Sequence, residues 1–147
     1  MITDAVNRLR HLCHVLPAAL HRISAHEYTA KPVPGKWSKK EILGHLIDSA
    51  ANNHQRFVRV QFEEMPAIWY DQDQWVVYSA HQHTPVEQLI GFWESYNRYL
   101  AFLLEQIPEE RLGRLCRMKD GRTVTLGFLI DDYVAHLEHH LRQLTDY

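Results

Sequence analysis

Three histidines have the spacing of a metal site. His136 and His140 stand four residues apart in segment 131–141, and His45 lies far upstream in segment 41–48. Residues four apart share one face of a helix, so the pair can bind one ion. His45 can join them if the two helices pack together. Three imidazole nitrogens with an open fourth position are typical of a catalytic metal site.

The simpler interpretation is structural. An isolated histidine such as His45 is more often a hydrogen-bonded core residue than a ligand, and a bundle with buried histidines and no ion remains open. A polar row argues against it: His45, Ser49, Asn52 and Arg56 are spaced by four, three and four residues, beside an apolar helix face. Buried polar groups without partners cost about 1–3 kcal/mol, so this row needs a metal, water or ligand.

The histidines of the final helix fall on different faces. Its predicted apolar stripe consists of Leu126, Ile130, Tyr133, Leu137, Leu141 and Leu144. On a helical wheel His136 and His140 flank one edge of the stripe, at roughly 100° and 60° from its centre. His139 falls on the far face, so we expect it to meet solvent. Asp131 and Asp132 are solvent-facing groups or acceptors that orient an imidazole.

Four amphipathic segments with helical periodicity must position these residues. Pro17 should bend or divide the first, and Ser38 with Glu41 forms a capping box at the second. Thr84 and Pro85 restart a helix after a long aromatic loop, and Thr125 opens the last one. The expected helices are 3–26, 38–64, 84–106 and 125–145, with a loop at 65–83 and a turn-containing link at 109–123 that could form a short hairpin. The pattern predicts an all-α four-helix bundle.

Composition limits the partners. The chain of 147 residues fits a single domain over 1–147 and has a net charge of -2, from 16 basic and 18 acidic residues. No basic face stands out, so neither nucleic acid nor an anionic membrane is an expected partner. No signal peptide or membrane span is evident, and we expect a cytoplasmic protein with Cys13 and Cys116 reduced, although one disulfide remains an alternative.

The run 34–49, Pro-Gly-Lys-Trp-Ser-Lys-Lys-Glu-Ile-Leu-Gly-His-Leu-Ile-Asp-Ser, followed by Arg56, resembles the DinB/YfiT-like superfamily, in particular its DinB_2 branch. The resemblance covers essentially the whole chain. It implies a four-helix bundle with a long crossover between helices 2 and 3. It also implies a divalent ion, zinc or nickel, held by His45, His136 and His140. Relatives include bacillithiol- and mycothiol-dependent S-transferases and a mycothiol-dependent maleylpyruvate isomerase, and many are dimers.

These observations favour a metal-dependent enzyme that transfers a low-molecular-weight thiol to a small electrophile. The thiol would be a cosubstrate, and Ser49, Asn52 and Arg56 would line the substrate pocket. A metal-dependent hydrolase is the second hypothesis, although no glutamate is evidently placed as a general base: Glu41 points roughly 40° further from the core than His45. A non-catalytic metal-binding stress-response module is the third, and it favours a fourth protein ligand, with His54 or His81 as candidates.

Several remaining residues have structural interpretations. His81 and His83 are expected to be turn residues that face water. Trp69, Trp75 and Tyr78 are expected to pack, with pocket walls as the alternative. The aromatic residues of the third helix are expected mostly to fill the core, although they could also support a homodimer; they are Phe92, Trp93, Tyr96 and Tyr99.

Overall fold

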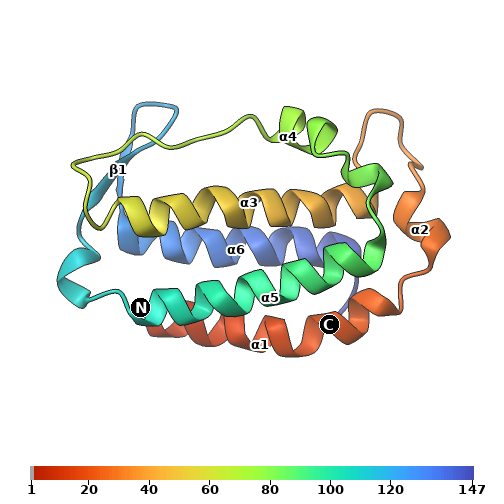
Figure 1. The fold of residues 1–147 in the computed structure, drawn as a ribbon, viewed down its shortest axis with the longest axis horizontal. Helices are drawn as coiled ribbons and strands as arrows, with labels where there is room; N and C mark the ends of the chain where they lie inside the picture. Colours follow the sequence, from red (N-terminus) through yellow and green to blue (C-terminus); the bar gives the residue numbers. More distant parts are fainter. Residues whose placement is uncertain (1) are drawn as a thin grey trace.

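Four long helices lie side by side in the computed structural model, which describes residues 2–147 (Figure 1). They are α1 (Ile2–His21), α3 (Lys39–Arg59), α5 (Val86–Glu105) and α6 (Leu126–Leu144). α1 packs against α5 and α6, and α3 packs against the same two helices. The expected all-α four-helix bundle is therefore confirmed, and α3 and α6, which carry the three histidines, are direct neighbours.

The connection between α3 and α5 is a long crossover. The two helices run in the same direction, so the chain must return along the bundle before α5 begins (Figure 1). α3 has 21 residues, a length of about 30 Å at 1.5 Å per residue. The return segment was predicted as a loop, but it contains a short helix, α4 (Gln72–Tyr78), and a 3-10 turn, η1 (His81–His83). Asp71 caps α4 by accepting a hydrogen bond from the Gln74 backbone N–H.

The first helix ends at His21, and the prediction that it continues to His26 is wrong. Ser24 instead caps a separate short helix, α2 (Ala25–Thr29). Pro17 lies inside α1 without dividing it. A proline cannot donate to the carbonyl four residues earlier, and the Cys13 carbonyl accepts a hydrogen bond from Arg98 of α5 at 3.0 Å instead. The bundle thus satisfies the group that Pro17 leaves unpaired.

Side-chain caps start α3 and α6 where they were expected. The capping box of Ser38 and Glu41 is complete, and Thr125 accepts a hydrogen bond from the Phe128 backbone N–H. α3 ends at Arg59 rather than at residue 64. The link before α6 contains a 3-10 turn, η2 (Glu109–Arg111), and the anticipated hairpin, in which β1 (Leu115–Arg117) pairs antiparallel with β2 (Thr123–Thr125).

The core follows the predicted stripes, with one exception on α5. All six apolar stripe residues of α6 are buried, and so is Trp93 of α5. Phe92 and Tyr99, however, are 53% and 51% exposed, so the expectation that they fill the core is wrong. Cys13 and Cys116 are buried free thiols. None of the helices in residues 2–147 is long and apolar enough to cross a membrane.

Candidate metal centre

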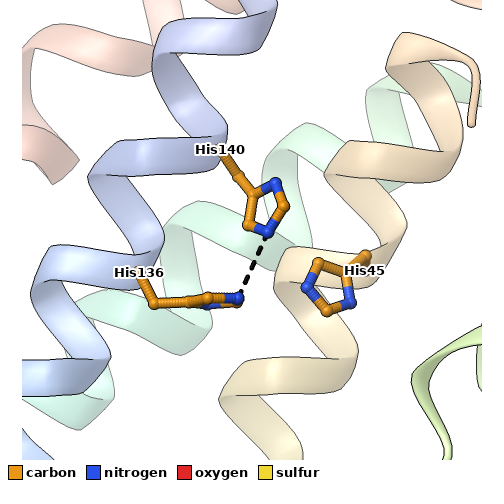
Figure 2. A group of neighbouring side chains, drawn as sticks. All are labelled: His45, His136 and His140. Atoms are coloured by element: carbon orange, nitrogen blue, oxygen red, sulfur yellow. Dashed lines mark hydrogen bonds between the residues drawn. The ribbon is translucent and has the colours of Figure 1, made fainter.

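The three predicted ligands meet between α3 and α6. His45 projects from α3, and His136 and His140 project from consecutive turns of α6, with the three rings facing one another (Figure 2). Each ring offers one nitrogen, and these nitrogens all lie within 4.8 Å of one another. The Nε2 atoms of His136 and His140 are 3.2 Å apart. Among the described residues, this is the group of histidine, cysteine and carboxylate side chains that could hold a metal ion.

The lack of hydrogen-bond partners at His45 shows whether these residues suit an ion. His45 is fully buried, and neither of its ring nitrogens has a hydrogen-bond partner. A buried polar atom without a partner costs about 1–3 kcal/mol, which coordination of a cation would offset. Two nitrogens bound to one tetrahedral zinc ion at about 2.0–2.1 Å stand about 3.4 Å apart, close to the His136–His140 separation. The donor set therefore fits a divalent ion.

The surroundings prepare the rings as neutral ligands. Burial, together with the neighbouring imidazoles, lowers the pKa of His45 to about 3 and that of His136 to about 4. Unprotonated rings retain the lone pairs that a metal requires. The Nδ1–H of His140 donates to Gln143 Oε1 at 2.9 Å. Because an amide oxygen only accepts, this contact leaves the His140 Nε2 lone pair available to an ion.

An outer cavity of about 420 Å³ opens beside His140. Trp37 forms one wall, with its ring 4.8 Å from the His45 ring and 6.5 Å from the His140 ring, measured between centroids. α4 contributes Gln72 and Asp73 to the lining. This cavity reaches the histidine cluster at His140.

A smaller inner cavity of about 130 Å³ lies on the His136 side. Ser49 and Arg56 line it, as does Asn53, the residue next to the predicted Asn52. Asn52 is buried away from this lining and donates to the Asp48 carbonyl at 2.9 Å. The prediction that Asn52 lines the pocket is therefore not matched by the geometry. The rest of the lining is Tyr70, Gln72, Asp132 and Tyr133.

The crossover is attached to α3 beside the inner cavity. Arg56 donates through Nε and Nη2 to the Ile68 carbonyl, at 3.0 and 2.6 Å. Tyr70 follows and lines the same cavity as Ser49. Burial raises the pKa of Tyr70 to about 12, so the phenol is neutral at physiological pH. Arg56 thus holds the backbone that places Tyr70 over the cavity.

A second attachment corrects the expectation that His81 faces water. His81 and Asp48 are both buried, and the His81 Nε2 lies 3.0 and 2.9 Å from the two Asp48 carboxylate oxygens. The ring packs against Gly44, where a Cβ would fall 2.1 Å from the His81 Cγ. Ala80, with φ of 55°, turns the chain into this position. His81 therefore bonds to Asp48 and is not a fourth ligand.

The other histidines and acids considered from the sequence lie outside the histidine cluster. His54 bonds through Nδ1 to the Tyr96 hydroxyl at 2.8 Å and stands outside the metal group, while His83 and His139 are exposed, as expected. Glu41 is held by the capping box and by Lys31 Nζ at 2.7 Å, so it is not available as a base. Asp131 is exposed, whereas Asp132 borders the inner cavity.

Two of three aromatic residues of the crossover do not pack as expected. Trp69 and Tyr78 are 48% and 84% exposed, whereas Trp75, 38% exposed, packs edge-on against Tyr70 with the ring centroids 5.4 Å apart; none of the three lines either cavity beside the histidines. The walls are made instead by Trp37 and Tyr70. Aromatic content alone does not distinguish a residue in a cavity wall from one on the surface. The only sequence signal for Trp37 and Tyr70 was that each directly precedes a helix cap, Ser38 or Asp71.

Known proteins resemble the chain along most of its length. The family model of the DinB superfamily matches residues 8–144. A provisionally named metal-dependent hydrolase of Oceanobacillus iheyensis is 23% identical over 146 residues, which cover 99% of this chain and 84% of the relative. YfiT of Bacillus subtilis, which carries a similar provisional name, is 30% identical over 115 residues, or 76% of this chain and 64% of YfiT.

Solved structures share the fold. YfiT of Bacillus subtilis, described as having an unusual four-helix bundle topology, aligns with a TM-score of 0.88 at 21% identity over 97% of this chain and 83% of that one. A mycothiol-dependent maleylpyruvate isomerase aligns with a TM-score of 0.79 at 12% identity over 98% of this chain and 60% of the isomerase. The family match, the bundle connectivity and the histidine cluster agree: the chain belongs to the DinB superfamily.

Proposed function

We propose that the protein is a metal-dependent enzyme that transfers a low-molecular-weight thiol to a small electrophile. The observation that carries the proposal is the buried His45, whose two unpaired ring nitrogens stand among the ligand atoms of His136 and His140. A divalent ion bound there, such as zinc or nickel, supplies the positive charge that keeps a coordinating thiol deprotonated at neutral pH. His140 connects this group to the outer cavity.

The chain's own groups position the reactants. The Gln143 contact orients the His140 ring, and Trp37 excludes water from one side of the His45 ring. The outer cavity has room for one reactant, and the inner cavity offers hydrogen-bonding groups on Ser49, Asn53 and Arg56 to the other. The mycothiol-dependent isomerase indicates that this fold accommodates a thiol cosubstrate in another protein.

The test is turnover of monochlorobimane with cysteine, glutathione and bacillithiol, each with and without added zinc or nickel. We expect the rate to depend on both the thiol and the ion, and to fall to background in His136→Ala. His139→Ala, one helix position from a ligand and exposed, should retain the rate. Equal rates with and without protein for every thiol would remove the proposal.

Metal-dependent hydrolysis is the second candidate, favoured by the names of the relatives. Its general base would be Asp132, the carboxylate that lines the cavity beside His136. Thiol transfer ranks higher because a coordinated thiol needs no such base. Asp132→Asn separates the two reactions: it should abolish ester hydrolysis under the second candidate and leave metal-dependent thiol transfer largely intact under the first.

A further inference from the structure

Arg56 has hydrogen-bonding capacity that the fold leaves unused. A guanidinium carries five N–H groups. Two point to the Ile68 carbonyl, and Nη1 donates to Asn53 Oδ1 at a long 3.3 Å. Two N–H groups on the terminal nitrogens have no acceptor, and within residues 2–147 Arg56 forms no ion pair with a carboxylate. Burial lowers its pKa from the ordinary value, and the nearby acidic groups, Asp132 among them, offset this only in part.

Arg56 borders the inner cavity, which also touches the candidate metal ligand His136. A guanidinium binds a carboxylate through two parallel N–H groups, so a ligand with an acidic end would match it. Its volume of about 130 Å³ is well below the 420 Å³ of the outer cavity. The cavity therefore holds a group of a few non-hydrogen atoms, while the larger outer cavity is left for a bulkier reactant.

The charges of the wall restrict the ligand further. Asp132 lines the same cavity and is exposed to solvent, so the wall holds one cation and one anion. A dianion such as phosphate would be repelled by Asp132, whereas a single carboxylate can lie against Arg56 with its neutral or cationic part toward Asp132. Ser49 and Asn53 add neutral hydrogen-bonding groups between the two.

We infer that the inner cavity binds the carboxylate end of a small thiol acid at Arg56, with the sulfur directed toward the histidine cluster. The inference rests on the proposed function, because it specifies the thiol that the metal centre would receive. It assigns Arg56 two roles: it holds the crossover through Ile68 and it selects a monoanionic ligand.

Isothermal titration of the zinc-loaded protein with mercaptopropionate and with its neutral amide tests this assignment. The two ligands have the same thiol and length and differ in charge. We expect the wild-type protein to bind the acid about tenfold more tightly than the amide, the range of a hydrogen bond to a charged group. This preference should fall to about twofold or less in Arg56→Gln, where only direct contact of the carboxylate with the ion remains.

Two further variants locate the effect independently of folding. Asp132→Asn removes the repelling charge from an exposed site and should raise the acid's preference about threefold. Arg59→Gln is the matched control: Arg59 lies on the same helix, pairs with Glu63 and lines neither cavity. The Arg59→Gln variant should prefer the acid over the amide to the same extent as the wild type.

Equal binding of acid and amide by the wild type would overturn the inference while leaving thiol transfer intact, since both thiols would still bind. A preference that survives Arg56→Gln unchanged would also overturn it. If neither thiol binds the zinc-loaded protein, both the inference and the proposed thiol chemistry fail.

Discussion

At the scale of single residues, burial and pairing distinguish ligands from other histidines. His45 has no hydrogen-bond partner, and His140 donates through Nδ1 to Gln143, so its Nε2, which faces the His136 Nε2 at 3.2 Å, carries a lone pair. His81 and His54 are already paired with Asp48 and Tyr96. One bonded nitrogen does not by itself prevent coordination through the other, so position also matters: the nitrogens of His45, His136 and His140 lie within 4.8 Å of one another, and His81 and His54 lie outside this group.

Replacing His136 with alanine should abolish stoichiometric metal binding. Loss of an outer hydrogen-bond partner of a ligand typically lowers metal affinity about 10–100-fold, and loss of a ligand itself should exceed that. Metal per chain after dialysis, measured by elemental analysis, checks this result. His139→Ala should keep the wild-type content because that ring is exposed. Equal metal content in the two variants would contradict the assignment.

The buried rings also predict the pH dependence of the metal-free protein. Burial lowers the pKa of His45 to about 3 and that of His136 to about 4. Below about pH 6.5 the unfolded chain binds protons at these rings and the folded chain does not, so the free energy of unfolding falls as pH decreases. The slope is up to about 1.4 kcal/mol per pH unit for each ring.

Urea unfolding at pH 7, 6 and 5, about the range over which these rings titrate when unfolded, measures this slope. His45→Gln should flatten it because the variant no longer has a suppressed proton-binding site. His139→Gln should retain the wild-type slope, since that ring is exposed. A His45→Gln slope as steep as that of the wild type would assign the acid sensitivity to other groups.

At the scale of elements, the crossover is attached to α3 on both sides of the cavity wall. Arg56 binds the Ile68 carbonyl before Tyr70, and Asp48 binds His81 after α4. Gln82 extends the second attachment by accepting a hydrogen bond from Ser38, the cap of α3. Because the segment between these attachments contributes Tyr70 and Gln72 to the cavities, its position on α3 determines their shape.

Gly44→Ala should destabilise the protein, although alanine favours helices over glycine by about 1 kcal/mol. The new Cβ would collide with the His81 ring and separate it from Asp48, an overpacking cost of about 1–3 kcal/mol in addition to the weakened contact. Gly91→Ala on α5 is the control, because its Cβ would meet nothing within 4 Å. Chemical unfolding should show opposite signs for the two variants, and a stabilised Gly44→Ala would contradict the role of His81.

At the scale of the whole molecule, the bundle has a core that does not depend on an ion. Residues from all four long helices form one buried apolar cluster, among them Leu9, Leu46, Trp93 and Leu137. The histidine group lies at the edge of this cluster, between α3 and α6. An ion at such a place adds its binding free energy to a structure that already folds, unlike the small domains that require zinc to fold.

Chelation should therefore leave a folded protein with a cooperative melting transition. The ion's contribution to the free energy of unfolding should follow its affinity and free concentration, at about 4 kcal/mol for a thousandfold excess over Kd. Removing the ion should lower Tm accordingly. Circular dichroism melts before and after dialysis against a chelator measure it, with loss of thiol transfer as the parallel readout. Complete unfolding on chelation would instead support a structural ion and a non-catalytic module.

The amino-acid sequence by itself predicted the four long helices and the three candidate ligands. Helical periodicity, the Ser38 cap and the spacing of His136 and His140 depend on neighbouring residues, so they can be recognised locally. The tertiary structure decided where the crossover lies. It buries His81 against Gly44, puts Asn53 rather than Asn52 at the cavity and places Tyr70 beside Ser49. Those contacts join residues distant in sequence, and they depend on the packing of helices, which no local pattern encodes.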